Sequence, residues 1–498
     1  MSTLASILNP QSATDLAISV PDGPDVSYAE FGQEIERVAE LLAGAGVQPG
    51  KAVSIVLPNS LEFMVVFLAV ARAGAIAAPL NSAYTADEFK FYMEDAEAQL
   101  AILPEGEHAA REAAALLGVP TIKAALDDAG RTVLSRGGDM LTERRDAPAP
   151  SPDDVALFLH TSGTTSRPKG VPLTHGNLAA SIKNISDTYA LTPDDKAMVV
   201  MPLFHVHGLI GVSLSTLSTG GSLVIPPRFS ASRFWGEQRD SGATWYSAVP
   251  TIHQILLARA DEEGAPHESF RLIRSCSAAL APAVFEQLEA RFGAPVLEAY
   301  GMTEASHQMS SNLLPPGDRM PGTVGKGTGV DIAIMNDDGN LVNAGDLAEV
   351  VIRGANVTHG YHNNPDANAE AFTNGWFRTG DQGFLDAEGT LTLTGRIKEL
   401  INRGGEKISP LEVDAALLGH PSVAEAVCFG VPHTMYGEAV QAAVVVSGDT
   451  SEDAIRAYCG EHLAGFKVPD RVYIIDTMPR TATGKIQRRH IAAMFSEE

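Results

Sequence analysis

The stretch HTSGTTSRPKGV, residues 160–171, combines five hydroxyl side chains, two glycines and two cations in twelve residues. It follows the apolar run VALFLH, which is typical of a buried strand, so we expect a loop at the end of that strand. Backbone N–H groups, hydroxyls and Lys169 in such a loop are suited to hold an oligophosphate. A Walker A loop is excluded, because Pro168 stands where its second glycine belongs and Gly170 where its Ser or Thr belongs. The sequence therefore predicts a phosphate loop of another kind.

The wider pattern predicts an α/β fold in two domains. Strand-like runs such as AVSIVLP alternate with helix-like runs such as DEFKFYMEDA, which favours largely parallel sheets packed with helices. A chain of 498 residues exceeds what one hydrophobic core usually supports. After Gly380 the strands become closely spaced and are separated by glycine turns. We therefore expect a large N-terminal domain, residues 1–395, and a small mobile α+β domain, residues 396–498.

Composition limits the possible partners and the compartment. The chain has 61 acidic and 36 basic residues, which argues against binding of nucleic acid or of an anionic membrane by the surface as a whole. The most apolar segment, residues 61–80, carries Glu62 and Arg72 and is expected to be a buried helix. Three separated cysteines and the lack of a secretory leader predict a cytoplasmic location. The sequence does not predict an oligomeric state.

Three further motifs carry candidate nucleotide-binding residues. In EAYGMTEASH, residues 298–307, Tyr300 offers an aromatic face, and Thr303 and Glu304 offer oxygen atoms, of which Glu304 suits Mg²⁺ on a triphosphate. In WFRTGD, Asp381 is a candidate acceptor for ribose hydroxyls. In PRTATGKIQRR, Lys485 lies in a glycine-containing loop and can reach a neighbouring site. Each motif alone is more often an ordinary turn or surface charge, so their combination carries the prediction.

Together with MPLFHVHG and GRIKELINRGGEKISPLEV, and in this order, these motifs resemble the acyl-adenylate-forming family. That family includes acyl-CoA synthetases, the adenylation domains of peptide synthetases and firefly-type luciferases. The resemblance extends over nearly the whole chain. One departure is Ser166, where the family loop usually has glycine. This difference affects the geometry of the loop rather than its role.

The resemblance implies a reaction and a set of roles. A carboxylate attacks the α-phosphate of ATP, pyrophosphate leaves, and the thiol of coenzyme A captures the acyl-adenylate. Mg²⁺ would bind Glu304, the α-phosphate would contact Thr303, and Lys485 would bridge the carboxylate and the α-phosphate. The nucleotide site would include Tyr300, with Asp381 and Arg396 at the ribose. The β- and γ-phosphates would be held by Lys169 and the loop residues Thr161, Ser162, Gly163, Thr164 and Thr165.

The resemblance also implies that the small domain adopts two orientations, one for each half-reaction. The hinge would lie at Lys398. In the second orientation Gly404 and Gly405 would line a tunnel for pantetheine, where two glycines allow close approach of the backbone. Candidates for the phosphates of coenzyme A are the basic residues Arg403, Lys407, Lys467 and Arg471.

The acid pocket is expected to be polar. Ser277, His307 and Ser310 stand where a pocket for a fatty or aryl acid would be apolar, and leaving each unpaired against hydrocarbon would cost about 1–3 kcal/mol. A small dicarboxylate explains this polarity, because its second carboxylate stays ionised and needs hydrogen bonds or a cation. The candidate partners are His207, Ser277 and His307; Arg274 is a less favoured candidate, because its strand position is expected to point it away.

The segments RSCSAALAP, SHQMSSN and ATWYSAVPTIHQI look like those of the oxalate-activating branch of the family, which implies oxalate as the substrate. Malonate and a coumarate-type aryl acid are the alternatives. A carrier-dependent adenylation domain is a further alternative, although no carrier segment follows Arg489. A non-catalytic nucleotide-binding protein would be expected to lack Lys485 or Glu304.

Overall fold

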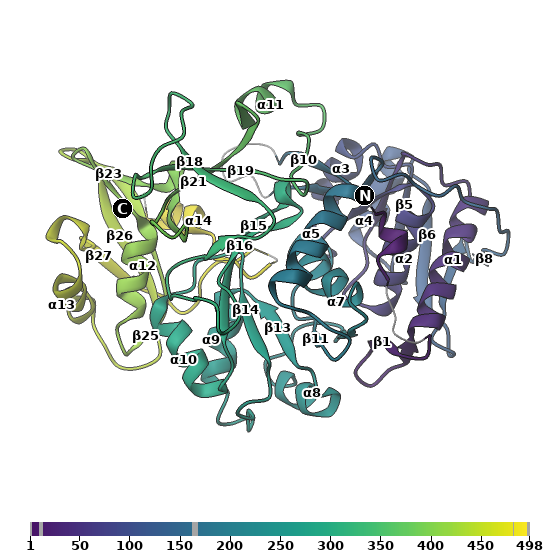
Figure 1. The fold of residues 1–498 in the computed structure, drawn as a ribbon, viewed down its shortest axis with the longest axis horizontal. Coiled ribbons are helices and arrows are strands. Elements are labelled where there is room, and N and C mark those ends of the chain that lie inside the picture. The colour runs from purple at the N-terminus through teal and green to yellow at the C-terminus, as the bar shows by residue number, and fades with distance from the viewer. Residues whose placement is uncertain (1, 9–12, 162–167, 482, 496–498) are drawn as a thin grey trace.

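The computed structural model describes residues 2–8, 13–161, 168–481 and 483–495. Four sheets and their covering helices make up this part of the chain (Figure 1). The α-helices are α1 (Tyr28–Gly44), α2 (Leu61–Arg72), α3 (Ala86–Asp95), α4 (Ala109–Leu117), α5 (His175–Thr188), α6 (Val206–Gly208), α7 (Ser215–Leu217), α8 (Phe234–Ser241), α9 (Pro250–Ala258), α10 (Pro282–Phe292), α11 (Pro365–Ala371), α12 (Pro410–Leu418), α13 (Glu452–His462) and α14 (Arg488–Phe495). Shorter turns are η1 (Leu4–Ser6), the π-helical η2 (Leu209–Leu214), η3 (Thr303–Ala305), η4 (Ile397–Glu399) and η5 (Gly465–Lys467).

An eight-stranded sheet forms the N-terminal layer and ends at the phosphate loop. Its order is β10 (Gly170–Thr174), β9 (Val155–His160), β4 (Ile76–Pro79), β3 (Ala52–Ile55), β5 (Leu100–Leu103), β6 (Thr121–Leu126), β7 (Thr132–Arg136) and β8 (Asp139–Met140). Strands β9, β4, β3, β5 and β6 are parallel. Helix α2 is buried from Phe63 to Ala71, as expected for this apolar segment. Among the described residues, no helix is both long and apolar enough to cross a membrane.

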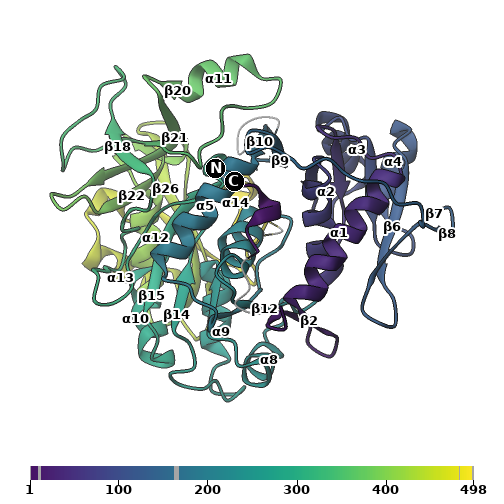
Figure 2. The ribbon, with the colours of Figure 1, turned by 45° about the vertical axis from the view of Figure 1, so that its right-hand side comes forward.

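A nine-stranded sheet lies at the centre of the molecule. Its order is β17 (Lys326–Gly327), β16 (His307–Ser311), β15 (Val296–Met302), β14 (Leu272–Ser275), β13 (Trp245–Ala248), β11 (Lys196–Met198), β12 (Ser222–Val224), β1 (Leu16–Ser19) and β2 (Asp25–Ser27). Strands β1, β12, β11, β13, β14 and β15 run parallel, so their carboxyl ends meet at one edge. Helix α5 and the π-helix η2 both contact β16. In Figure 2, α5 lies between this sheet and the N-terminal layer that contains α1 and α2.

Two antiparallel sheets complete the fold. The third sheet contains β18 (Asp331–Met335), β19 (Ala348–Arg353), β21 (Trp376–Leu385), β20 (Phe372–Thr373) and β22 (Leu391–Arg396). The fourth contains β24 (Glu406–Ile408), β23 (Ile401–Arg403), β26 (Gly437–Val446), β25 (Val423–His433) and β27 (Arg471–Ile474), of which only the β26–β27 pair is parallel.

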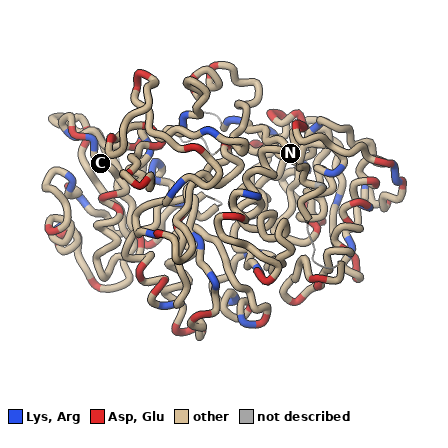
Figure 3. Tube along the Cα trace, in the orientation of Figure 1, with Lys and Arg blue, Asp and Glu red and all other residues tan. Residues whose placement is uncertain are grey.

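The predicted fold class is confirmed: two large, mainly parallel sheets with helices precede a small α+β C-terminal part. The predicted boundary at residue 395 stays a prediction. Strand β22 ends at Arg396 and pairs with β21, and η4 follows it directly. In the view of Figure 3, acidic and basic residues are interspersed along the trace.

Candidate active site

The phosphate side of the site begins where β9 ends. The N–H of Thr161 donates to the carbonyl of Lys169 at 3.0 Å, so the two ends of the predicted phosphate loop are joined. The loop residues Ser162, Gly163, Thr164 and Thr165 lie outside the described part of the chain. The Lys169 ammonium lies 4.3 Å from the ring centroid of Tyr361. This cation–π geometry holds the lysine side chain over the tyrosine ring.

The segment before α11 brings Tyr361 and Glu304 to this lysine. Thr358 donates its N–H to the Glu304 carbonyl at 2.7 Å, and His362 donates its N–H to the Gly170 carbonyl at 2.8 Å. Tyr361 Oη then donates to Glu304 Oε1 at 2.8 Å. Thr303 and Glu304 are both buried in η3 at the end of β15. This places the predicted phosphate and metal residues side by side.

A single carboxylate is a suitable protein ligand for a phosphate-bound Mg²⁺. The other ligands of that ion are usually water and phosphate oxygens. Glu304 retains acceptor capacity beyond its bond to Tyr361, so it fits this role. Within the described ranges, no group of three or more His, Cys, Asp or Glu residues is placed to hold a metal by itself.

The predicted ribose residues meet across paired strands. Asp381 on β21 is the register partner of Arg396 on β22, and Arg396 Nε lies 2.9 Å from Asp381 Oδ1. Tyr300 Oη donates a short hydrogen bond to Asp381 Oδ2. Burial raises the pKa of Asp381, and the charge of Arg396 opposes that rise. The structure therefore brings Tyr300, Asp381 and Arg396 together, with Tyr300 and Asp381 buried and the Arg396 side chain partly exposed.

Lys485 enters this region from the C-terminal part of the chain. Its loop is anchored by Thr251, whose Oγ1 donates to the carbonyl of Gly484 at 3.1 Å. The Lys485 side chain is accessible to solvent. Partial desolvation by the surrounding protein nevertheless lowers the pKa of its ammonium, and the nearby charge of Arg396 lowers this pKa further. His205, two residues before His207, has its pKa lowered to about 4 by burial and then by Lys485. Lys485 thus lies within electrostatic range of both the ribose cluster and the predicted acid pocket.

The acid-pocket candidates form a buried polar network. His207 Nδ1 is 3.0 Å from Ser277 Oγ, and His207 Nε2 is 2.7 Å from Ser247 Oγ. The rings of His207 and His307 stack with centroids 5.1 Å apart. Both imidazoles are fully enclosed, and burial followed by the charge of Arg274 lowers the pKa of each well below its usual value. Both histidines are therefore neutral at pH 7.

Arg274 does not point away from this network, and that expectation is wrong. Its side chain is fully buried and lies in the centre of the cluster. Four neutral groups surround its guanidinium: Tyr189 Oη at 2.7 Å, Ser247 Oγ at 3.0 Å, His307 Nε2 at 3.0 Å and Gln308 Oε1 at 2.9 Å. Arg274 on β14 is the register partner of Ser247 on β13. Because side chains alternate between the two faces of a strand, both side chains lie on the same face of the sheet.

Two of the acid-pocket candidates have unusual backbone conformations. Ser277 and His307 have φ values of +73° and +127°, a region that non-glycine residues avoid because of its cost in strain. A Cβ on Gly211, within the π-helix η2, would lie 2.4 Å from the His307 ring. A Cβ on Gly301 would lie 2.2 Å from the His307 carbonyl oxygen. Both glycines therefore make room for His307, and π-helical turns of this kind are frequent at functional sites.

Comparison with known proteins shows the family to which the chain belongs. The AMP-binding enzyme family matches residues 10–362, and the AMP-binding enzyme C-terminal domain matches residues 412–485. The chain belongs to the AMP-binding enzyme family. It is 52% identical over 492 residues to an oxalate–CoA ligase of Arabidopsis thaliana, an alignment that covers 97% of this chain and 96% of the relative. It is 49% identical over 474 residues to an oxalate–CoA ligase of Saccharomyces cerevisiae, with 89% of this chain and 87% of the relative covered.

A solved structure shares the whole architecture. The ATP-bound crystal structure of MatB from Rhodopseudomonas palustris superposes with a TM-score of 0.89 at 32% identity, and 99% of each chain is covered. The fold of this AMP-binding enzyme is therefore that of a protein crystallised with ATP. The coverage includes the C-terminal part as well as the nucleotide region.

Other predicted residues lie apart from this cluster. Gly404 and Gly405, with φ values of +62° and +96°, form the turn between β23 and β24. The N–H of Gly404 donates to the Tyr436 carbonyl at 2.7 Å. Lys398 lies in η4, between β22 of the third sheet and β23 of the fourth sheet. In Figure 1, β23 lies at the left edge of the molecule, whereas β15 and β16 lie near its centre.

Three of the four cations suggested for coenzyme A have local partners. Arg403 pairs with Asp470 at 3.1 Å, and Lys467 pairs with Glu412 at 2.7 Å. Arg471 lies over the ring of Tyr473, 5.1 Å from its centroid. Their role at the phosphates of coenzyme A stays a prediction.

The sequence analysis missed several members of the network in this AMP-binding enzyme. Ser247 and Gln308 occur within segments that the resemblance identified, but nothing in those segments singles out either residue. Tyr189 directly follows α5, more than a hundred residues before Gln308, and donates to Gln308 Oε1 at 2.8 Å. A sequence pattern contains no signal for such a contact, because only the packing of α5 on β16 creates it.

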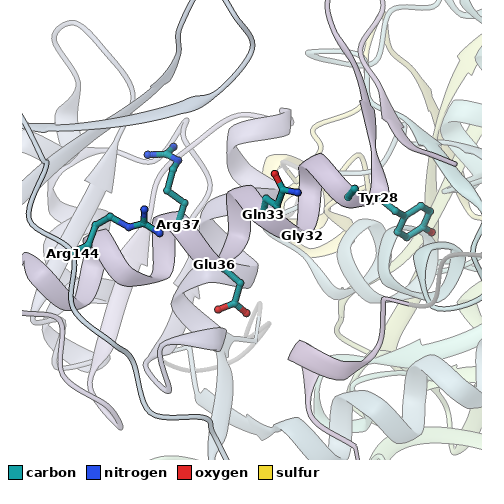
Figure 4. A pocket seen from close by; sticks show the side chains of 7 residues that line it. Tyr28, Gly32, Gln33, Glu36, Arg37 and Arg144 are labelled. Atoms are coloured by element: carbon teal, nitrogen blue, oxygen red, sulfur yellow. The ribbon is translucent and has the colours of Figure 1, made fainter. Parts of the chain in front are cut away.

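A shallow hollow lies on a different surface. It has a volume of about 590 Å³ and is lined by residues of α1 together with Arg144 (Figure 4). Its charged residues are already paired: Arg37 with Glu34 at 2.6 Å, and Arg144 with Glu40. This hollow contains none of the nucleotide or acid candidates.

Proposed function

We propose that this enzyme is an ATP-dependent oxalate–CoA ligase that forms oxalyl-CoA, AMP and pyrophosphate. One observation carries the proposal: the buried polar network offers hydroxyls, neutral imidazoles and a cation, and such groups match a small acid with a second carboxylate. The two relatives named oxalate–CoA ligase, at 52% and 49% identity, support the choice of acid. A fatty or aryl acid would leave these polar groups unpaired, at a cost of about 1–3 kcal/mol each.

In the first half-reaction, an oxygen of one oxalate carboxylate attacks the α-phosphorus of ATP. The bond from that phosphorus to the bridging oxygen of pyrophosphate breaks, and pyrophosphate leaves with its electron pair. The barrier arises from the approach of an anion to a polyanion, so the protein's contribution is charge neutralisation and alignment. We assign Lys169 to the β- and γ-phosphates, Thr303 to the α-phosphate and Lys485 to the meeting point of carboxylate and α-phosphate.

The remaining nucleotide residues hold the substrate in place. We assign the ribose hydroxyls to Asp381 and Arg396, and the base to the surface beside Tyr300. Mg²⁺, when bound, supplies further positive charge to the triphosphate, and Glu304 is the residue that would hold it. The distal carboxylate of oxalate is assigned to His207, Ser277 and His307.

In the second half-reaction, the thiol sulfur of coenzyme A attacks the acyl carbon of oxalyl-adenylate. The bond from that carbon to the AMP oxygen breaks, AMP leaves, and the thiol proton passes to water or to a basic group. We propose that residues 396–498 turn about Lys398 between the two steps, so that Lys485 leaves and the Gly404–Gly405 turn enters. This movement also defines the proposed domain boundary.

A panel of acids tests the proposal. Pyrophosphate release and coenzyme A-dependent AMP formation would be measured with oxalate, malonate, acetate, a medium-chain fatty acid and coumarate. We expect oxalate to lead in kcat/KM by about a hundredfold, which corresponds to two unmatched polar groups. Preference for coumarate or a fatty acid would leave the adenylation chemistry intact but would contradict the assignment of His307 and Ser277. Absence of acid-dependent pyrophosphate release would contradict the enzymatic function itself.

A further inference from the structure

The buried charge of Arg274 is not balanced by an acidic residue. Its guanidinium contacts Tyr189, Ser247, His307 and Gln308, all of them neutral. Among the described residues, no carboxylate forms an ion pair with it. An arginine cannot relieve burial by losing its proton, since its pKa in water exceeds about 12. An unbalanced buried cation costs several kcal/mol, so the site gains stability when an anion enters.

The nearest buried carboxylate on the adjacent strand does not supply this balance. Glu298 on β15 is the register partner of Ser275, whereas Arg274 is the register partner of Leu297. Neighbouring positions on a strand point to opposite faces, so Glu298 and Arg274 lie on opposite sides of the sheet. Burial also raises the pKa of Glu298 to about 8, which keeps this carboxyl mostly protonated at pH 7.

Hydrogen-bond direction connects Arg274 with the residues assigned to the acid. Arginine only donates, so Ser247 Oγ and His307 Nε2 accept from it at 3.0 Å each. The Ser247 hydroxyl hydrogen is then available to His207 Nε2 at 2.7 Å. His207 therefore carries its hydrogen on Nδ1 and donates to Ser277 Oγ at 3.0 Å. The hydroxyl of Ser277 and the Nδ1–H of His307 remain as donors for the substrate.

We propose that Arg274 is the positioning residue that makes the pocket selective for an acid with a second negative charge. It acts through two chains, one through His307 and one through Ser247, His207 and Ser277. Both chains orient neutral groups so that they donate, and the guanidinium supplies the positive charge behind them. The inference rests on the proposed function, since the second charge is the distal carboxylate of oxalate.

The test compares oxalate with oxamate, which has the same shape but carries one negative charge less. Wild-type enzyme is expected to prefer oxalate in kcat/KM by on the order of 100-fold, the size of effect seen when a buried charge loses its partner. Arg274→Met removes the charge at similar length and is expected to abolish most of that preference. It should raise the KM for oxalate while the KM for ATP stays unchanged. Arg274→Lys keeps the charge and is expected to retain part of the preference.

Arg271→Met is the matched control. Arg271 precedes β14 and pairs with Asp195 at 2.7 Å, outside the network. It is expected to change thermal stability without changing the ratio of oxalate to oxamate activity. A folded Arg274→Met enzyme that keeps the wild-type ratio would overturn the proposal, as would a wild-type enzyme that uses both acids equally well.

Ser247→Ala covers the case in which Arg274→Met does not fold. This change cuts one of the two chains and leaves Arg274 in place, so the oxalate preference is expected to fall about tenfold. An unchanged preference in Ser247→Ala would contradict the chain that runs through His207. The failure of the proposed function has a different signature, because wild-type enzyme would then release no pyrophosphate with oxalate at all.

Discussion

The nucleotide side and the acid side of the site differ in how their charges are balanced. On the nucleotide side, Asp381 faces Arg396 at 2.9 Å and Glu304 accepts from Tyr361 at 2.8 Å. On the acid side, the four side chains that hydrogen-bond to Arg274 in the described part of the chain are neutral. The nucleotide residues are therefore stabilised before any ligand binds, whereas the acid side is completed by its substrate. Specificity for the acid follows from this unbalanced charge.

The two sides also differ in how the fold assembles them. The nucleotide residues come from three sheets: Lys169 lies beside β10, Glu304 follows β15, and Asp381 lies on β21. The acid pocket is built mainly within the nine-stranded sheet, from β13, β14 and β16, with the π-helix η2 against it. Substitutions at residues where different sheets meet should therefore affect ATP chemistry most. Substitutions within the central sheet should mainly affect the choice of acid.

The largest effect that would sharpen this comparison is expected from Lys485→Ala. Pyrophosphate release should fall by about 10²–10³-fold, the loss typical of one removed donor at a developing charge. Conversion of supplied oxalyl-adenylate to oxalyl-CoA should be unchanged. In wild type, the bridging role requires the protonated amine, and the pKa of Lys485 is lowered. The first half-reaction should therefore decline as pH rises through that lowered value, which a pH–rate profile would measure.

Two variants serve as controls for Lys485→Ala. Lys183→Ala removes an exposed lysine that pairs with Asp187 on α5 and should change neither half-reaction. Gly405→Val places a bulky side chain on the turn assigned to the tunnel and should impair thioester formation while sparing pyrophosphate release. Equal loss of both half-reactions in Lys485→Ala and in Gly405→Val would contradict the two-orientation mechanism.

The next effect separates the two sides through KM. His307→Ala removes an acceptor of Arg274 and a donor assigned to the acid. The KM for oxalate should rise by about 10- to 100-fold, as expected for about 1–3 kcal/mol of lost hydrogen bonding, and the KM for ATP should stay near its wild-type value. His267→Ala, at an exposed histidine on another surface, is the control. An unchanged KM for oxalate would remove His307 from the pocket.

A smaller effect is expected where the backbone makes room for the pocket. Gly211→Ala would place its Cβ 2.4 Å from the His307 ring, so this ring must shift. Overpacking of this kind costs about 1–3 kcal/mol, and we expect kcat/KM for oxalate to fall about tenfold. Gly236→Ala, in α8 with no atom within 4 Å of the new Cβ, is the matched control and should leave activity unchanged. Equal activity of the two variants would show that the π-helix does not shape the acid pocket.

The comparison also explains how far the sequence alone could lead. The fold class follows from alternating strand and helix patterns, and the nucleotide candidates occur in short motifs whose residues lie near strand ends. The position of the Arg274 side chain could not be predicted from the sequence. A strand pattern predicts that neighbouring side chains alternate between two faces, but not which of these faces lies toward the acid pocket. Its partners Tyr189, Ser247 and Gln308 come from three different elements. Their meeting depends on the packing of α5 and on strand register, which local sequence does not encode.

The smallest expected effect concerns Glu298, a second buried ionisable group of the central sheet. Glu298 is buried on β15, and its Oε2 has no hydrogen-bond partner among the described residues. Burial raises its pKa from an ordinary value of 4.5 to about 8, so folding takes up a proton between these two values. The free energy of unfolding attributable to Glu298 is therefore greatest below pH 4.5 and falls as pH rises toward 8.

Glu298→Gln should remove this dependence, since a neutral amide can still accept the N–H that Leu280 donates at 2.9 Å. The Tm of wild type should fall between pH 6 and pH 8.5 by about 1–3 °C more than that of the variant, as measured by circular dichroism. Glu286→Gln, on the exposed side of α10, should keep the wild-type dependence. Parallel curves for wild type and Glu298→Gln would show that Glu298 is balanced by another group. A steeper wild-type curve would mean that proton uptake neutralises Glu298, whereas Arg274, which cannot lose its proton, requires an anionic ligand.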